Sequence, residues 1–544
     1  MKFTIKSLML SLVILFAGGT ATFSQSQYHS PEEINSALKA LNKSYPNLTV
    51  LETIGQTYSG KDINALTIGS GETGSKPGIA IIGGIDGRYQ AGREISLGFA
   101  EKLLANADSE EIKELLAGLS FYVIPDASPD ASSGFFSAPA YERMGNANPT
   151  DNDRDFETDE DPAEDINGDG LISIMRIKDP TGDYITDPAD SRLMKKADKS
   201  KGERGEWLVY TEGIDNDKDG KFNEDGEGGV NFNNNFSFEY EEFGESAGIN
   251  AVSEKETRAV ADFLYEHFNI FAVFSFGPQD NLGQAFKAKG PSPQAGRRGP
   301  GKVTSILKED ETLNKLLSSM YLEQTEYKGS PGFSREPGNF MEWAYYHYGR
   351  YSYSTPGWWF PSENGLSAEA SFLKYADENM DEEVFVEWQK TDHPDFPGKT
   401  VEIGGIVPFS MYAPPPETLE KAIENNYLFL VDAAKLHPDV ELVDLKTEKL
   451  EKDIHRVSVT LHNKGIFSTT SELGDYNKWM RKMKVELSSD SDFELISGRK
   501  IEITERLRGD ESREYSWLIH GKGDFTISAG AVNCGIDRIS FSIK

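Results

Sequence analysis

The chain is 544 residues long, and 38% of its residues are hydrophobic, 11% aromatic and 27% charged. This is the composition of a soluble globular protein, and the length predicts at least two domains. The 89 acidic residues outnumber the 56 basic ones and give a formal net charge of −33. Such a chain repels polyanions, so we expect neither nucleic acid nor an anionic membrane surface as a partner.

The first 24 residues have the pattern of a secretory signal peptide. Lys2 and Lys6 precede an apolar run at 8–17, and small residues follow it. The run is short for a membrane span, although an uncleaved anchor is the alternative, and no later segment predicts a transmembrane helix. We therefore expect an exported protein that is periplasmic, extracellular or at the cell surface. Cys534 is the single cysteine, so no internal disulfide is expected and its side chain is predicted to be a small buried hydrophobe.

Helix and strand patterns alternate over the first part of the chain. Helices are predicted from Ser30 to about residue 45, and from a glycine-rich turn at 83–89 to about residue 104. The strand patterns lie at 49–54, 62–68, 79–82 and 120–125. The last two are continuous apolar runs, which is typical of strands that are buried on both faces.

The alternation resumes after a long insertion. A helix is predicted at 253–267, with Ser253 as its N-cap and Glu256 three residues later in the pattern of a capping box. A strand pattern at 270–277 and a long helix at 416–436 complete the series. Strands that alternate with helices in this way predict an α/β sheet domain.

The sequence therefore predicts two domains. Residues 27–437 form the α/β domain, which includes an Asp-rich insertion at 139–228. An insertion of this length in a compact domain is usually functional or is stabilised by a bound group. Residues 440–544 contain short alternating runs separated by turn residues, which predicts a C-terminal all-β sandwich.

The glycine-rich turn at 83–89 has the sequence GGIDGRY and links the buried strand at 79–82 to the following helix. Such a turn is a common place for binding or catalytic groups. Its sequence resembles the Gly-Gly-x-His-Gly-x-Glu motif of the M14 metallocarboxypeptidases. The segment SPDA at 128–131 is similar to the family's Asn-Pro-Asp-Gly, and GVNFNNNF at 229–236 is similar to its Gly-Val-Asp-Leu-Asn-Arg-Asn-Phe. The resemblance extends over about residues 28–436, and similar Asp-rich insertions occur in a bacterial branch of the family.

The resemblance implies a central mixed sheet flanked by helices, and a zinc ion held by two histidines and a glutamate. The three ligand positions fall here on Asp86, Tyr89 and Phe274. An aspartate ligates zinc more weakly and with a different reach, a tyrosine is a poor ligand at neutral pH, and phenylalanine cannot bind a metal. The family's glutamate base falls on Pro356, which has no proton to exchange. Zinc is therefore expected in the family but not in this chain.

The groups that hold the substrate's carboxylate in the family are partly kept. The carboxylate-clamping arginine falls on Asn234 and the neighbouring asparagine is kept as Asn233, while Arg88 and Arg143 remain at family-like places. We therefore predict a catalytically inactive, exported protein that binds the C-termini of peptides or glycopeptides around these four residues. Two alternatives stay open: an active metallocarboxypeptidase with an unconventional metal site, and a calcium-stabilised structural module of the cell surface.

Three Asp-rich segments have the spacing of calcium-binding loops. Residues 165–173 and 215–223 place oxygen ligands at alternate positions with a glycine for the sharp turn, and 151–155 is a degenerate third copy. The candidate ligands are Asp165, Asn167, Asp169, Ser173, Asp215, Asp217, Asp219, Asp151, Asp153 and Asp155. The twelfth positions hold Arg176 and Gly226 in place of glutamate, which favours structural calcium over a helix–loop–helix switch. The alternative is a solvated acidic loop without metal.

Overall fold

The computed structural model describes residues 27–544 except 152–155, 224, 227, 245, 290–301 and 478–479; the predicted signal peptide lies outside the described residues. The central element is a six-stranded sheet with the order β1-β2-β4-β3-β9-β10. Its strands are β1 (Thr49–Gln56), β2 (Asp62–Ile68), β4 (Ser120–Ile124), β3 (Gly78–Ile82), β9 (Ile270–Phe276) and β10 (Tyr351–Thr355). The β1–β2 and β2–β4 pairs are antiparallel and the other three are parallel, so the predicted mixed sheet is confirmed.

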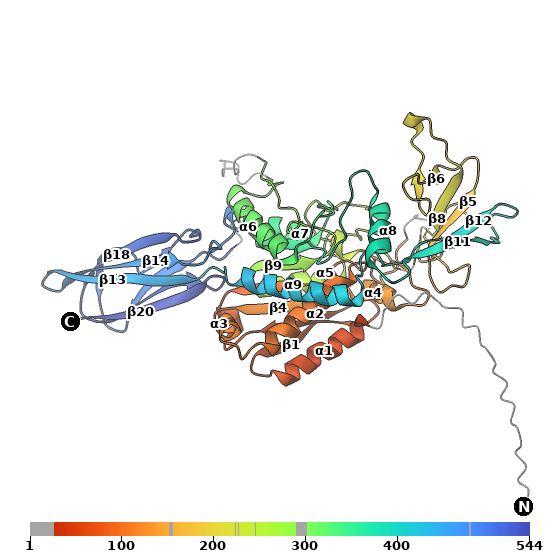
Figure 1. Cartoon of the computed structure of the whole chain (residues 1–544). Helices are drawn as coiled ribbons and strands as arrows, with labels where there is room; N and C mark the ends of the chain where they lie inside the picture. Colours follow the sequence, from red (N-terminus) through yellow and green to blue (C-terminus); the bar gives the residue numbers. More distant parts are fainter. Residues whose placement is uncertain are drawn as a thin grey trace, which may run out of the picture.

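Helices pack on both faces of this sheet (Figure 1). The α-helices of the described residues are α1 (Pro31–Ser44), α2 (Gln90–Ala105), α3 (Glu110–Gly118), α4 (Pro129–Ser132), α5 (Lys255–Glu266), α6 (Lys308–Thr325), α7 (Phe340–Tyr346), α8 (Ala368–Asn379), α9 (Pro416–Ala434) and α10 (Glu472–Asn477), of which α8 packs instead with Leu193 and Phe385 of the second sheet region. Helices α1, α2, α6 and α9 share one hydrophobic cluster with Ile81 and Phe274, whereas α5 and α7 share another with Ala80 and Val273. Neighbouring residues of a strand point to opposite faces, so the two clusters lie on opposite sides of the sheet. None of the described helices is both long and apolar enough to span a membrane.

Two predicted helix starts have different outcomes. Ser30 caps α1, and Glu33 completes the capping box. Helix α5 instead follows Glu254 as its N-cap, and Ser253 Oγ donates a hydrogen bond to Glu254 Oε1 (2.6 Å). The predicted Ser253 cap is therefore wrong, because its hydroxyl bonds a neighbouring carboxylate and not the first turn of the helix.

A second six-stranded sheet has the order β11-β12-β5-β8-β6-β7 and lies at the end of the molecule opposite the C-terminal strands (Figure 1). Its strands are β5 (Ile174–Lys178), β6 (Tyr184–Thr186), β7 (Met194–Lys196), β8 (Trp207–Thr211), β11 (Phe385–Thr391) and β12 (Val401–Ile406). The insertion thus supplies four strands, which join two strands from much later in the chain. Arg176 holds this sheet together: its guanidinium lies 4.7 Å from the ring of Trp207 and 4.0 Å from that of Trp388, and it pairs with Glu402. The sequence patterns did not predict this sheet.

The C-terminal region consists of two four-stranded antiparallel sheets that share one hydrophobic core. One sheet contains β13 (Val440–Glu451), β14 (Ile454–Asn463), β18 (Ser512–His520) and β16 (Glu494–Ser497); the other contains β17 (Ile501–Ile503), β15 (Lys484–Ser489), β19 (Gly523–Ala531) and β20 (Gly535–Ile543). Trp517 from the first sheet and Ile527 from the second are both buried in this core, with Cys534 beside them. The predicted all-β sandwich is confirmed.

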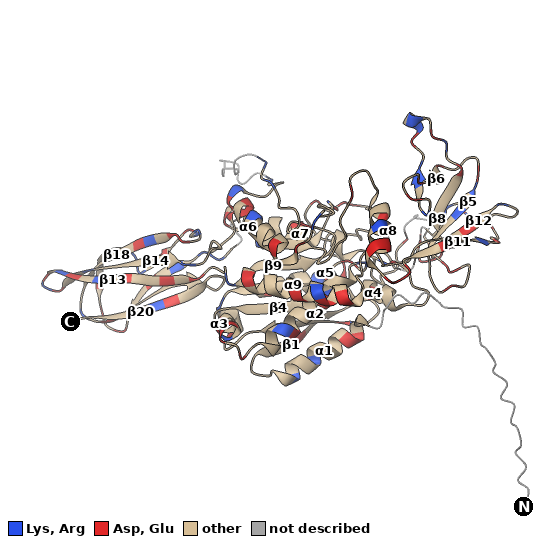
Figure 2. Cartoon of the chain, in the orientation of Figure 1, with Lys and Arg blue, Asp and Glu red and all other residues tan. Residues whose placement is uncertain are grey.

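Charged groups at the start of α6 contact the chain that enters the sandwich. Glu309 pairs with Arg506 and with Arg508 (2.8 Å). The adjacent Asp310 is buried and accepts a hydrogen bond from the backbone N of Glu472 (2.8 Å). Burial raises the pKa of Asp310 to about 6. Elsewhere, acidic and basic side chains are interspersed along the helices and sandwich strands (Figure 2).

Candidate functional site

The glycine-rich turn at 83–89 leaves the carboxyl end of β3 and leads into α2. Close packing requires glycine at two of its positions. A Cβ on Gly84, which has a φ of +65°, would lie 2.5 Å from Asp126 Oδ1, and a Cβ on Gly87 would lie 2.3 Å from the carbonyl oxygen of Arg143. The turn is therefore packed tightly against two other segments, which fixes the direction of its side chains.

Asp86 and Arg88 form a closed ion pair within this turn. Asp86 is 1% exposed, and its Oδ1 accepts hydrogen bonds from the backbone N (3.0 Å) and Nε (3.1 Å) of Arg88, while its Oδ2 accepts one from Nη2 (2.9 Å). Burial lowers the pKa of the Arg88 guanidinium, but the neighbouring Asp86 carboxylate outweighs this effect and raises the pKa above its usual value. The guanidinium supplies the positive charge that a buried carboxylate requires.

Tyr89 lies next to this pair and packs against Tyr412, which precedes α9. The two ring centroids are 4.9 Å apart, and the guanidinium carbon of Arg88 lies 5.8 Å from the first ring and 5.5 Å from the second. Burial raises the pKa of both hydroxyls above the usual value. Both side chains are therefore neutral phenols at physiological pH, and neither is an anionic metal ligand.

Two glutamates that the sequence analysis did not single out lie near the ion pair. Glu142 Oε1 accepts a hydrogen bond from the backbone N of Phe409 (2.6 Å). Burial raises the pKa of both Glu142 and Glu336, and in each case the charge of Asp86 adds to this effect and that of Arg88 opposes it. Both glutamates come from segments distant from the turn in sequence, which is why a motif search did not identify them.

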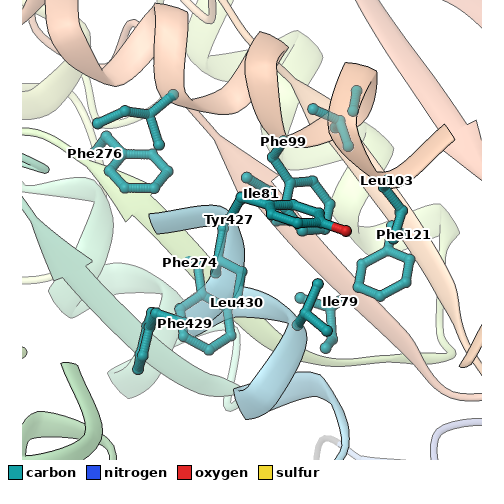
Figure 3. Close-up of a cluster of buried hydrophobic side chains, with 14 of the residues drawn as sticks. Ile79, Ile81, Phe99, Leu103, Phe121, Phe274, Phe276, Tyr427, Phe429 and Leu430 are labelled. Atoms are coloured by element: carbon teal, nitrogen blue, oxygen red, sulfur yellow. The ribbon is translucent and has the colours of Figure 1, made fainter. Parts of the chain in front are cut away.

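Phe274, the predicted third ligand position, is a core residue and not part of this site. Its ring packs against Tyr353 (centroids 5.2 Å apart) and Phe429 (6.0 Å), and Figure 3 shows it between the sheet and α9. It lies within β9, and its side chain points to the face of the sheet that α1, α2, α6 and α9 cover. The residue that leaves β9 at its carboxyl end is Gly277, where a Cβ would lie 2.6 Å from Ile85 Cδ1. Gly277 therefore offers no side-chain ligand atom at this end of the strand.

The two asparagines predicted to bind a ligand are used in internal hydrogen bonds. Asn233 is 0% exposed; its Nδ2 donates to Gln279 Oε1 (2.9 Å) and its Oδ1 accepts from the backbone N of Phe340 (3.0 Å). Asn234 Nδ2 donates to Ser246 Oγ (2.9 Å). Asn233 therefore supports the surrounding loops from inside the protein.

Arg143 and Pro356 have different surroundings. The guanidinium of Arg143 donates hydrogen bonds to the carbonyl oxygens of Gly145 (3.2 Å) and Asn146 (2.9 Å), while its own backbone packs against the turn. Pro356, the predicted base position, is buried directly after β10. The structure thus brings Arg143 to the turn that carries the ion pair, and it places no proton-exchanging side chain at position 356.

Two segments of the chain match known families. Residues 34–170 match the model for zinc carboxypeptidases, the M14 peptidases, and residues 439–542 match a domain of unknown function (DUF8731). Carboxypeptidase E of Caenorhabditis elegans is 30% identical over 139 residues, which cover 24% of this chain and 29% of that protein. The predicted resemblance to the M14 zinc carboxypeptidases is confirmed. The matched segment contains the turn and its ion pair.

Other M14 proteins give matches of the same kind. Carboxypeptidase B of Astacus astacus is 30% identical over 112 residues, which cover 21% of this chain and 36% of that protein. The chain thus spans about a third of the length of these curated relatives. Among solved structures, thrombin activatable fibrinolysis inhibitor is 16% identical with a TM-score of 0.40, and the match covers 77% of this chain and 79% of that one.

The side chains at the predicted zinc-ligand positions do not fit a zinc ion. Both carboxylate oxygens of Asp86 are bonded by the Arg88 guanidinium, and Tyr89 is a neutral phenol. In the described part of the chain, none of the eight histidines is a hydrogen-bond or ring partner of these three residues. The guanidinium would also repel a divalent cation at this carboxylate. An ion would therefore have to displace a charged side chain that is already bound.

The two complete Asp-rich loops have the same local geometry. In the first, Asp165 Oδ2 accepts a hydrogen bond from the backbone N of Gly170 (2.9 Å); in the second, Asp215 Oδ2 accepts one from Gly220 (3.1 Å). The two glycines have φ values of +87° and +93°, which is the conformation required for the predicted sharp turn. Among the described residues, one group of three acidic side chains, Asp215, Asp217 and Asp219, has its ligand atoms within 4.8 Å of one another.

Each loop is bound by an acidic residue that precedes the other loop. Glu212, which precedes the 215–223 loop, accepts a hydrogen bond from the backbone N of Ile166 (2.8 Å). Asp161, which precedes the 165–173 loop, accepts hydrogen bonds from the backbone N of Asn216 (2.9 Å) and Asn223 (2.7 Å). The two loops therefore order each other. Sequence reasoning missed both acids because they lie outside the alternating ligand spacing.

The remaining candidate calcium ligands are less uniform. Ser173 is buried, and its Oγ donates a hydrogen bond to Glu212 Oε2 (3.3 Å). Asp151 Oδ2 accepts a hydrogen bond from the backbone N of Phe156 (3.1 Å). The other acids of this degenerate segment, Asp153 and Asp155, lie outside the described residues.

Proposed function

We propose that this protein is an exported, catalytically inactive relative of the M14 zinc carboxypeptidases that binds the C-termini of peptides or glycopeptides. The observation that carries the proposal is the bidentate contact between Asp86 and Arg88. The Arg88 guanidinium neutralises Asp86, the carboxylate at the predicted position of the first zinc ligand. An arginine side chain thus stands where the family's catalytic zinc ion would supply the positive charge. No step of hydrolysis is left for these residues to perform.

Binding of a chain end is supported by the polar groups that remain around the turn. Arg88 is partly exposed, with 20% of its side-chain surface accessible, and its guanidinium lies beside the packed rings of Tyr89 and Tyr412. A guanidinium flanked by phenols is suited to a carboxylate, since it offers charge and directed N–H donors. Arg143 lies close to the same turn. Asp86 binds the Nε–Nη2 edge of the guanidinium, and Nη1 has no hydrogen-bond partner among the described residues, so it is available to a ligand.

One sample tests catalysis and binding together. The mature protein is dialysed against zinc and calcium, analysed for bound metal, and assayed for release of C-terminal residues from a peptide. We expect no stoichiometric zinc and no release, together with binding of a fluorescent peptide acid that is stronger than binding of the same peptide as its C-terminal amide. Stoichiometric zinc with release that a chelator abolishes would refute inactivity and support the alternative of an unconventional metal site.

We also propose that calcium stabilises the insertion, and the observation behind this is the three-carboxylate group of Asp215, Asp217 and Asp219. Carboxylates held this close repel one another unless a cation lies between them, and oxygen ligands favour calcium. Calcium is therefore expected to raise the thermal midpoint of the protein, and Asp217→Asn to remove most of that increase. Asp183→Asn is the matched control, since Asp183 is exposed on the same insertion and pairs with the exposed Lys199 (3.2 Å). An equal calcium response in both variants would contradict the site and leave a solvated acidic loop.

A further inference from the structure

A cavity of about 580 Å³ lies between the second sheet and the segment at 405–412. Strands β5 to β8, β11 and β12 contribute to its lining, together with the beginning of α8. This volume is typical of pockets that hold a small ligand or a large side chain. Glu142 and Tyr412 line the cavity and also border the Asp86–Arg88 pair. The cavity therefore adjoins the site proposed to bind the chain end, and the insertion builds most of its wall.

The charges that line this cavity are unbalanced. The guanidinium of Arg192 is paired with Asp190 and with Asp377, both at 2.7 Å, and Lys195 pairs with Glu203 (3.4 Å). Both lining cations are therefore already neutralised by carboxylates. The lining carboxylates without an ion-pair partner among the described residues are Glu142, Asp187 and Glu369. The cavity thus has a surplus of negative charge.

The rest of the lining suits a cation on an apolar stem. Its aromatic side chains are Tyr141, Tyr184, Trp388 and Tyr412. Aromatic faces and carboxylates both attract cations, and the attraction is larger where water is excluded. Aliphatic and thioether side chains, such as Ile174 and Met411, provide contacts for methylene groups.

We propose that this cavity binds the side chain of a lysine or arginine residue in the peptide ligand. The inference rests on the proposed function, because it assumes a peptide held by the adjacent chain-end site. The ammonium or guanidinium group would meet the three unpaired carboxylates, and the methylene stem would pack against the aromatic and aliphatic walls. The second sheet would then select among peptides, which gives the insertion a role in recognition.

The test uses fluorescein-labelled alanine hexapeptides in which one lysine occupies each position from the second to the fifth. Each is compared with the same peptide carrying norleucine, which keeps the stem and removes the charge. Each is also made as the C-terminal acid and as the amide. At the position that reaches the cavity, we expect lysine to bind about tenfold more tightly than norleucine, which is the effect of one partly desolvated cation contact.

Protein variants test the same contact from the other side. Glu369→Gln and Asp187→Asn are each expected to reduce the lysine preference several-fold, by removing one carboxylate charge. Glu378→Gln is the matched control: it lies on the same helix as Glu369, is exposed and does not line the cavity. It is expected to leave the preference unchanged.

The outcomes separate the two proposals. Lysine and norleucine peptides that bind equally, with the acid still preferred over the amide, would overturn the cavity assignment and leave chain-end binding intact. A lysine preference shared by acids and amides would support the cavity and refute recognition of the C-terminus. A preference that persists in both carboxylate variants would place the cation elsewhere. Absence of binding by every peptide would overturn both proposals.

Discussion

Glu256 offers the sharpest test of how charge is buried in this protein. It lies in the first turn of α5, it is 1% exposed, and its Oε2 accepts a hydrogen bond from Asn146 Nδ2 (3.1 Å). The same amide group also donates to Glu254 Oε2 (3.0 Å). Burial raises the pKa of Glu256 from 4.5 to about 7, and the charges of Asp130 and Glu254 add to the rise. One amide donor therefore serves two buried carboxyls, and Glu256 Oε1 has no hydrogen-bond partner in the part of the chain that the structure describes.

The size of the effect follows from this pKa. The rise from 4.5 to about 7 means that ionising Glu256 costs about 3 kcal/mol more in the folded than in the unfolded protein. The unfolded protein then binds fewer protons between these pH values, so this group lowers the free energy of unfolding as the pH rises from 4.5 to 7. The cost is complete above pH 7 and absent below 4.5. Glu256→Gln, which stays neutral, is therefore expected to be more stable than the natural protein at pH 8 by up to about 3 kcal/mol.

Urea denaturation followed by tryptophan fluorescence, at several values between pH 4.5 and 8.5, measures this difference. Glu266→Gln is the matched control, because Glu266 is an exposed residue at the other end of the same helix. Its effect is expected to stay within about 0.5 kcal/mol at every pH. A stability difference for Glu256→Gln that does not change with pH would refute the reasoning, as would a loss of stability at pH 8.

Three further predictions concern the Asp86–Arg88 pair and the packing of the core. Arg88→Met leaves the buried Asp86 carboxylate without its cation and is expected to lower the free energy of unfolding by about 3 kcal/mol, measured by urea denaturation. The Arg88→Met/Asp86→Ala double variant should recover most of this stability. An equal loss in the double variant would count against the pair. A Cβ on Gly98 would lie 2.5 Å from Ile423 Cγ2. Gly98→Ala is therefore expected to lower the free energy of unfolding by about 2 kcal/mol, and by much less in an Ile423→Ala background. The same loss in both backgrounds would contradict this contact. Phe274→Ala is expected to lower the free energy of unfolding by about 4 kcal/mol, because it leaves a cavity in the core. Phe274→His is expected to bind no zinc in metal analysis. Stoichiometric zinc in this variant would place position 274 in the metal site.

The central sheet could be predicted from sequence because its parallel strands are buried on both faces. The run at 79–82, for example, is continuously apolar and is followed by a glycine-rich turn, so β3 and its connection to α2 are visible locally. The second sheet lacks such a signal. Strand β11 (Phe385–Thr391) is short, and after the buried Phe385 its residues are only partly buried or exposed; in β12, Val401 pairs with Ile177 of the insertion. Pairing between such distant segments is decided by tertiary packing, which no local pattern reports.

The site was predictable only where its residues are neighbours in the chain. Asp86, Arg88 and Tyr89 share one turn, and the structure finds them in contact. The prediction of Phe274 as a zinc-ligand position rests on the similarity of a short sequence motif. Such a motif does not define the face of the sheet to which a residue in the middle of a strand points. Glu142 and Tyr412 reach the turn from separate segments, so their place beside it depends on the fold as a whole.

Under the proposed function, in which the chain holds no zinc, the ion pair would also make a return to a zinc site difficult. A histidine at position 86 would leave the Arg88 guanidinium without its carboxylate and close to any ion that the histidine attracted. A glutamate at position 89 would lose the ring contact that Tyr89 makes with Tyr412. A third ligand at the end of β9 would need a side chain at Gly277, where a Cβ would already lie 2.6 Å from Ile85 Cδ1. Each single change towards a metal site is thus expected to be destabilising by itself, because Asp86, Tyr89 and Gly277 each contact a neighbouring group that the change would disturb.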